Sequence, residues 1–329
     1  MKTRRQFLTD VGKAALPAVA MSSSLLSPAL MVRSQGRTDD AQNKRIRVGI
    51  IGAENSHTIG FGKLFNVDKK FPGVEVLYVW GETDEFARNA AEKGSIPTIV
   101  KDPSEMMGKI DALIVDHRHP KFHLGAALPF VKAGIPTFVD KPFCYRVDEG
   151  KEFLKIAREA GTPVTSFSSI AQSDGTFDLK AQVQAIGDIE HVFSFGPADI
   201  NSEYGGIFFY GVHVVQPLMF VFGEDVVRVR ITRTSKGATA SIMFESGRDA
   251  SLLFTQGRDR GTMVFTKEST IKLEPRVEES DPPRHYRDIV SMFRTGKEPR
   301  SHDNILRCVA VLAALEQSVS TQEWTDVIV

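Results

Sequence analysis

The hydrophobic positions of the chain follow two different rhythms, one on each side of residue 165. Up to that residue, short runs of β-branched residues alternate with stretches whose apolar residues have helical spacing. The runs predict buried strands at residues 46–52, 74–80, 99–100, 112–115, 137–139 and 163–165. Helices are predicted at residues 84–93, 122–133 and 153–160, each followed by a glycine. Strands that alternate with helices are typical of an α/β protein with a doubly wound parallel sheet.

Beyond residue 166 the predicted strands are separated by short segments rich in serine and glycine. These strands occupy residues 226–232, 238–244, 250–254 and 262–265. Because short connections join antiparallel neighbours, we expect a meander. Outer helices are predicted at residues 178–185, 212–221, 285–293 and 304–318. The second half should be an α+β domain with a mainly antiparallel sheet, and we expect one face of that sheet to meet a partner subunit in a homo-oligomer.

The first 42 residues have a different character from the rest. The pair Arg4-Arg5 precedes two large apolar residues, and a weakly hydrophobic stretch follows at residues 11–32. Prolines and serines interrupt this stretch, so we expect no stable membrane span after processing. The segment resembles a twin-arginine export signal, which predicts a periplasmic or other extracytoplasmic protein. The alternative is a basic amphipathic helix without an export role. The predicted organisation is therefore an export signal and linker (1–42), a first domain (43–165) and a second domain (166–329).

The amino-acid composition excludes only a few classes of protein and says less about function than the candidate site residues do. Apolar residues make up 42% of the chain and charged residues 25%, which excludes a disordered chain and a polytopic membrane protein. The 41 basic residues balance 41 acidic ones, so no net charge attracts the chain to nucleic acid. The two cysteines, Cys144 and Cys308, are too few for a disulfide framework.

The turn after the first strand partly matches a dinucleotide-binding turn. That turn has glycine at its first, third and sixth positions, which here hold Gly52, Glu54 and His57. A Glu54 carboxylate beside the phosphates would be repulsive unless its side chain turns away. The predicted cofactor contacts at this turn are Gly52, Ala53, Asn55, Ser56 and His57. Glu82, one residue later than the usual acid after the second strand, is either the ribose ligand or part of a solvated helix start.

A second group of candidates follows the fourth predicted strand, at the edge of the sheet that binds ligands. It contains Asp116, His117, His119 and His123, which we predict to contact the cofactor. Two other interpretations stay open, namely a divalent metal held by these residues and a solvated or packing role. The favoured interpretation includes no metal ligand.

Lys141 follows the fifth predicted strand, within Asp140-Lys141-Pro142. At this strand end its ammonium would lie where a substrate binds, so it could polarise a hydroxyl or exchange a proton with it. The alternative is a surface lysine beside Asp140.

The order of these motifs resembles that of the glucose–fructose oxidoreductase and inositol dehydrogenase family, Gfo/Idh/MocA, over residues 45–329. The family usually shows Glu-Lys-Pro where this chain has Asp-Lys-Pro, and Asp-x-Gly-x-His-x-x-Asp on a later helix. In the corresponding stretch this chain keeps His213 but has Phe209 and Gln216 at the acidic positions. The resemblance implies a Rossmann-like first domain, NAD or NADP as cofactor, and a sugar or polyol as substrate. It also implies that Lys141 and His213 are catalytic, and an ordinary histidine pKa of about 6.5 suits a base.

The sequence therefore favours an exported NAD(P)-dependent oxidoreductase acting on a small carbohydrate. A variant is a redox-neutral enzyme that holds its cofactor tightly. One alternative is a cofactor-free carbohydrate-binding protein on the same fold. Another is a metal-dependent hydrolase or lyase that uses His117, His119 and His123.

Overall fold

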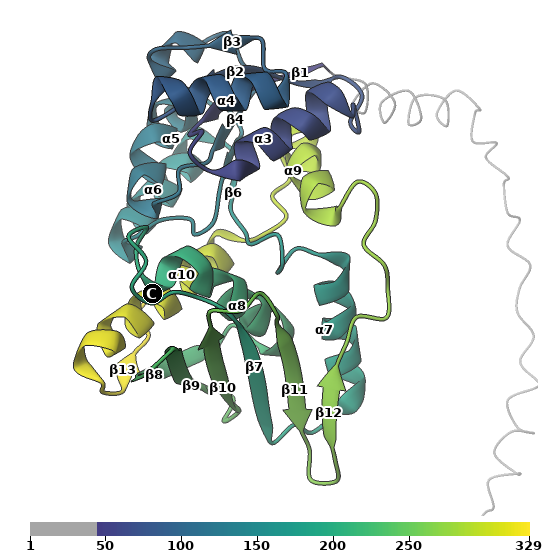
Figure 1. Ribbon diagram of the computed structural model, residues 1–329, viewed down its shortest axis with the longest axis vertical. Helices are drawn as coiled ribbons and strands as arrows, with labels where there is room; N and C mark the ends of the chain where they lie inside the picture. The colour runs from purple at the N-terminus through teal and green to yellow at the C-terminus, as the bar shows by residue number, and fades with distance from the viewer. Residues whose placement is uncertain (1–44) are drawn as a thin grey trace, which may run out of the picture. The chain divides into compact units, whose positions relative to one another are not determined.

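A computed structural model describes residues 45–329 of the chain, in which two sheets are stacked along the molecule (Figure 1). The export signal predicted for residues 1–42 lies outside the described residues. Within residues 45–329, no helix combines the length and apolar character needed to cross a bilayer.

The first sheet has six parallel strands in the order β3-β2-β1-β4-β5-β6. The strands are β1 (Ile46–Ile51), β2 (Val74–Trp80), β3 (Thr98–Ile99), β4 (Ala112–Val115), β5 (Thr137–Val139) and β6 (Val164–Thr165). The two central strands, β1 and β4, are buried on both faces apart from one partly exposed residue, as their β-branched sequences predict. This strand order is that of a doubly wound sheet.

Helices cover both faces of this sheet. They are α3 (Ser56–Gly62), η1 (Lys63–Val67), α4 (Asp84–Gly94), η2 (Pro103–Met106), η3 (Pro120–Phe122), α5 (His123–Lys132) and α6 (Val147–Ala160). Capping residues determine where two of these helices begin or end. Thr83 caps the start of α4, and Gly161 ends α6 in the left-handed conformation that favours glycine.

The second sheet has seven strands in the order β12-β11-β7-β10-β9-β8-β13. They are β7 (His191–Pro197), β8 (Val226–Thr234), β9 (Gly237–Phe244), β10 (Asp249–Thr255), β11 (Gly261–Phe265), β12 (Thr270–Leu273) and β13 (Thr325–Asp326). Strands β8, β9 and β10 form the predicted meander, and along β9 buried and exposed residues alternate. The predicted α+β class with a mainly antiparallel sheet is thus confirmed.

The prediction that this meander continues from β10 to β11 is wrong. Strand β7 lies between them, parallel to β10 and antiparallel to β11. The short loop at residues 256–260 therefore crosses the end of β7 instead of forming a hairpin. The sequence of β7 contains serine, glycine and proline, so it carries no strong strand signal.

Helices α7 (Asp174–Ile186), α8 (Ile207–Phe222), α9 (Arg284–Thr295) and α10 (His302–Thr321) complete the fold. Helix α10 packs against α6, α8 and β8, so it joins the two halves.

The prediction that residues 285–293 form an outer helix of the second domain is wrong. In α9, Ile289, Val290 and Phe293 are buried in the hydrophobic core of the first sheet. The amphipathic pattern correctly predicts a buried face but does not indicate which sheet it covers.

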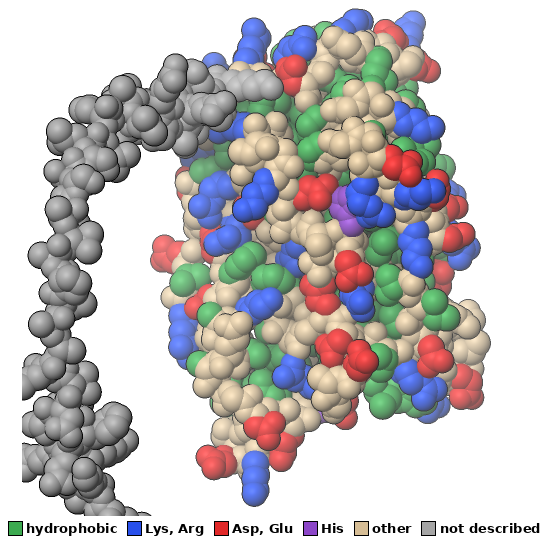
Figure 2. All heavy atoms as spheres, turned by 180° about the vertical axis from the view of Figure 1, so that it is seen from behind, with side chains coloured by type: hydrophobic (Ala, Val, Ile, Leu, Met, Phe, Trp, Pro, Cys, Tyr) green, Lys and Arg blue, Asp and Glu red, His purple; other side chains and the backbone are tan. Residues whose placement is uncertain are grey.

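The surface shows no concentration of one charge on the face seen in Figure 2. Acidic and basic side chains are interspersed there over both halves of the described chain. This agrees with the equal numbers of basic and acidic residues.

Candidate functional site

Lys141 lies at the carboxyl end of β5, where the chain leaves the sheet. Its side chain is 5% exposed, and Nζ lies 3.7 Å from Asp140 Oδ2. The ammonium also faces the aromatic ring of Phe209 on α8, with Nζ 5.2 Å from the ring centroid. The end of β5 and helix α8 together place a buried cation at the edge of the sheet where ligands bind.

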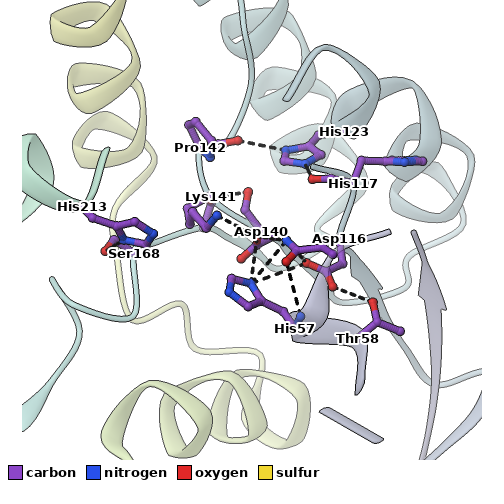
Figure 3. A network of polar contacts seen from close by, with 12 residues as sticks. His57, Thr58, Asp116, His117, His123, Asp140, Lys141, Pro142, Ser168 and His213 are labelled. Carbon is purple, nitrogen blue, oxygen red and sulfur yellow. Dashed lines mark hydrogen bonds and ion pairs between the residues drawn. The ribbon is translucent and has the colours of Figure 1, made fainter. Parts of the chain in front are cut away.

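His57, Asp116 and Asp140 form a cluster beside this lysine (Figure 3). His57 Nδ1 lies 3.2 Å from Asp140 Oδ2 and 3.7 Å from Asp116 Oδ1. The side-chain amide of Asn55 donates to both carboxylates, at 2.9 and 3.1 Å, and Thr58 Oγ1 donates to Asp116 at 2.6 Å. The turn after β1 and the ends of β4 and β5 therefore converge on one polar network.

The charges of this network are compensated within it. Burial raises the pKa of Asp116 well above its ordinary value, and the Asp140 carboxylate raises it further. Burial would also raise the pKa of Asp140, but His57 and Lys141 outweigh it and lower that pKa. Asp140 in turn raises the pKa of His57. A neutral Asp116 beside an ionised Asp140 and a protonated His57 is the arrangement that these shifts favour.

The same three side chains have the spacing of metal ligands, since one ligand atom from each lies within 4.8 Å of the others. However, donors from Asn55 and Thr58 already bind the carboxylate oxygens. Two cations, His57 and Lys141, also lie against Asp140. The network is therefore satisfied by the chain's own groups, and the absence of a metal here stays a prediction.

The turn after β1 keeps one feature of a dinucleotide-binding turn, a close backbone approach that only glycine allows. Gly52 has a φ of +110°, and a Cβ on it would lie 2.6 Å from the backbone carbon of Asp116. Glu82 Oε2 accepts hydrogen bonds from the backbone N–H groups of Ala53 and Glu54, at 2.8 and 2.9 Å. The acid that follows β2 thus reaches the turn despite its displacement by one residue along the chain. Ser56 is exposed at the first position of α3.

Glu82 is ionised at this turn. Its other oxygen, Oε1, is bonded to His117 Nδ1 at 2.8 Å. Burial would raise the pKa of Glu82, but the hydrogen bonds from His117 and from the turn lower it to about 2. A carboxylate can accept further hydrogen bonds, so Glu82 is placed to bind ribose hydroxyls.

The Glu54 side chain turns away from the turn. Tyr204 Oη donates to Glu54 Oε1 at 2.7 Å, and Arg118 Nη1 lies 3.6 Å from the same oxygen. The expected repulsion with phosphate is therefore reduced by a cation and a hydroxyl. Together with Gly52 and Glu82, this arrangement fits a dinucleotide with its pyrophosphate at the turn and one ribose at Glu82.

The three predicted histidines of the β4 loop do not converge. His117 bonds to Glu82, whereas His119 Nδ1 accepts from the Lys121 backbone N–H at 3.2 Å. The ring of His119 stands edge-on to Tyr145, with centroids 5.2 Å apart. The loop therefore offers no shared metal-binding point for its imidazoles.

His123 is fully buried and joins two loops. Its ring nitrogens lie 2.9 Å from the carbonyl oxygen of Pro142 and 2.8 Å from that of His117. Burial lowers the pKa of His123 to about 4. Its place in the structure matches the packing alternative, in which it holds the β4 loop against the segment after Lys141.

His213 projects from α8 toward the same crevice as Lys141 (Figure 3). Its Nδ1 lies 2.7 Å from Ser168 Oγ, and the Ser168 backbone N–H donates to Gln216 Oε1 at 2.6 Å. Burial lowers the pKa of His213 well below its ordinary value, and the Lys141 ammonium lowers it further. The imidazole is therefore neutral near pH 7, as a proton acceptor must be.

The structure thus brings Lys141 and His213 close together beside the His57–Asp140 pair (Figure 3), and adds residues that the sequence did not indicate. These residues are Ser168, Tyr204 and Arg260. None of them belongs to a sequence motif, because each reaches the site only through contacts with residues far away in the sequence. Gln216, which replaces an acid of the family pattern, holds Ser168 in place instead.

The doubly wound sheet, its glycine turn and the lysine at β5 are the features that the sequence shares with a family of dinucleotide-binding oxidoreductases. Residues 46–167 match the model of the oxidoreductase family with an NAD-binding Rossmann fold, Gfo/Idh/MocA. The resemblance predicted from the motifs is thus confirmed over these residues.

Solved structures with the same fold cover nearly all of the described chain. The GenD2 protein of gentamicin A biosynthesis, in complex with NAD, is 13% identical with a TM-score of 0.74, over 87% of this chain and 97% of that one. The myo-inositol dehydrogenase of Lactobacillus casei, with NAD(H) and myo-inositol, is 14% identical with a TM-score of 0.73, over 87% and 97%. The WlbA dehydrogenase of Bordetella pertussis, with NADH and UDP-GlcNAcA, is 16% identical with a TM-score of 0.71, over 87% and 100%. No curated protein matches the sequence significantly. At these identities the likeness establishes the fold.

Proposed function

We propose that this chain is an NAD-dependent oxidoreductase that interconverts a hydroxyl and a carbonyl group of a sugar or polyol. The observation that carries the proposal is the meeting of a buried ammonium, Lys141, with a neutral imidazole, His213, beside a turn that fits a dinucleotide. Two proteins of the same fold were crystallised with a carbohydrate ligand and NAD(H) or NADH, which supports this substrate class.

The chain's own groups would handle the proton. The Lys141 ammonium would bind the oxygen of the reacting hydroxyl. If His213 Nδ1–H donates to Ser168 Oγ, Nε2 keeps its lone pair and can accept the hydroxyl proton. Ser168 and Gln216 would therefore act as positioning residues for the base. The bound dinucleotide would supply the hydride acceptor.

Glu82 favours NAD over NADP. Its ionised carboxylate would accept hydrogen bonds from the ribose hydroxyls of NAD but would repel the 2′-phosphate of NADP. We also propose export by the twin-arginine route and a homo-oligomer. Tight cofactor binding, with redox-neutral turnover, would suit a protein exported after it has folded.

The first test is cofactor binding. The purified chain is denatured and any released dinucleotide is measured, and NAD, NADH, NADP and NADPH are titrated by calorimetry. We expect dinucleotide near one per chain, or NAD(H) binding at least about tenfold tighter than NADP(H), which is ~1.4 kcal/mol. A folded protein that binds neither cofactor would overturn the proposal and favour a carbohydrate-binding protein.

The second test separates the two catalytic residues from the fold. Lys141→Ala should abolish turnover on a panel of sugars and polyols, while the Kd for NAD changes by less than about tenfold. His213→Asn should also lower kcat, and Lys121→Ala, at an exposed lysine of the β4 loop, should leave kcat unchanged. Wild-type turnover in Lys141→Ala would remove Lys141 from the mechanism.

A further inference from the structure

A large cavity opens from the catalytic crevice into the second domain. It has a volume of about 840 Å³ and lies between helices α7 and α8 and strands β7, β11 and β12, with His213 in its wall. Ser169 and His285 line both this cavity and the small cavity at Lys141, so the two spaces are adjacent. A volume of this size is typical of ligand pockets, and it leaves room for more of a substrate than the reacting carbon.

The cavity is lined by two cations and two carboxylates, and one of the cations, the exposed Arg260, is paired with neither carboxylate. Lys272 is paired with Glu274, and Glu279 accepts hydrogen bonds from the backbone N–H groups at the start of α7, at 3.1 and 3.0 Å. The guanidinium of Arg260, in contrast, has no hydrogen bond or ion pair with any residue among 45–329. The adjacent Asp259 does not line the cavity.

Lys141, like Arg260, is a cation that lies near the proposed base, His213. Both Lys141 and Arg260 lower the pKa of His213, so both cations lie close to it. Helix α8, which carries His213, contains no charged residue along its whole length. The nearby carboxylate of Asp140 is already paired with His57. Arg260 therefore adds a cation without a carboxylate partner to the part of the site that holds Lys141 and His213.

We propose that the substrate is a sugar acid, and that Arg260 binds its carboxylate while Lys141 and His213 act on a hydroxyl. This inference rests on the proposed function. A planar guanidinium fits a carboxylate with two parallel hydrogen bonds, and one free cation matches one negative charge. Arg260 is thus a specificity residue, and it lies outside the groups that handle the proton.

The test compares sugars that differ at one carbon, which carries a carboxylate in the acid and a hydroxymethyl group in its neutral partner. Initial rates with NAD are measured for matched pairs such as glucuronate with glucose and galacturonate with galactose, and for glucose 6-phosphate. We expect kcat/KM to be at least tenfold higher for the sugar acid of the preferred pair than for its neutral partner. Arg260→Ala should remove that preference mainly through a higher KM, and Arg260→Lys should keep part of it.

Two controls keep the result specific. Arg258→Ala changes an exposed arginine of the same loop and should alter neither rate, and all variants should bind NAD as the wild type does. Equal rates for acid and neutral partners, or an acid preference that survives in Arg260→Ala, would overturn the inference but leave the proposed function intact. A preference for glucose 6-phosphate over the sugar acids would also overturn the inference, because Arg260 would then bind a phosphate. Absence of NAD binding and of all oxidation would refute the proposed function itself.

Discussion

At the scale of the residue, burial and pairing decide what each candidate histidine can do. His57 and His213 lie in the same crevice, yet their pKa values move in opposite directions. Asp140 raises the pKa of His57, whereas burial and the Lys141 ammonium lower the pKa of His213. The sequence names both residues but contains no signal for this difference, because Asp140 and Lys141 meet them only in the folded chain. The network therefore favours the protonated form of His57, whereas it favours the neutral form of His213, which can accept a proton.

His123 gives a prediction at this scale. Its ordinary pKa of about 6.5 is lowered to about 4 by burial. Because the folded pKa is the lower one, this residue's contribution to stability is present above pH 6.5 and is lost as the pH falls through 4. The shift corresponds to about 3 kcal/mol of unfolding free energy.

The measurement is urea unfolding of the wild type and of His123→Gln at pH 7.5 and at pH 4.5. At pH 7.5 we expect the variant to be less stable by about 2 kcal/mol, because the buried hydrogen bond that the neutral imidazole donates to a backbone carbonyl is lost together with the packing of the ring. At pH 4.5 the two should differ much less, since glutamine does not titrate. The same difference at both pH values would show that protonation of His123 does not limit stability.

At the scale of the element, the sequence predicts strands and helices better than it predicts their neighbours. The strands of the first sheet follow from β-branched runs that end at glycine or at a turn. Strand β7 and the packing of α9 do not follow, because both depend on contacts with segments far along the chain. Lys141 could be placed from its strand end alone, whereas its neighbour Asp140 pairs with His57, 83 residues away.

Gly52 gives a prediction at the scale of the turn. Gly52→Ala would put a Cβ 2.6 Å from the Asp116 backbone, so the end of β1 and the β4 loop would have to separate. Gly134 is a matched control, because it also has a positive φ, +80°, but its Cβ would meet nothing within 4 Å. We expect Gly134→Ala to cost about 1 kcal/mol of unfolding free energy and Gly52→Ala about 3 kcal/mol or more. Equal losses in urea unfolding would mean that the close approach is not rigid.

At the scale of the whole molecule, the two halves meet over the glycine turn. Tyr204, in the segment before α8, donates to Glu54 in the turn, and Arg118 Nη1 donates to Tyr204 Oη at 3.0 Å. The Arg118 guanidinium also lies 4.0 Å from the centroid of the Tyr204 ring. This contact supplies partners for the carboxylate that departs from the glycine pattern. The third position of the turn can therefore be acidic because the second domain supplies a partner for it.

A double-mutant cycle on Glu54 and Arg118 tests this coupling through the Kd for NAD. Arg118→Gln removes the cation beside Glu54, so more of the negative charge of this carboxylate would act on the pyrophosphate, and binding should weaken by about five- to tenfold, or ~1 kcal/mol. Glu54→Gln removes the like charge and should tighten binding slightly. In the double variant, Arg118→Gln should have little further effect, because the charge that it compensated is gone. Weaker binding in Glu54→Gln alone would show that Glu54 contacts the dinucleotide directly, for instance at a ribose. If the two changes simply add, Arg118 acts on the phosphates and not through Glu54.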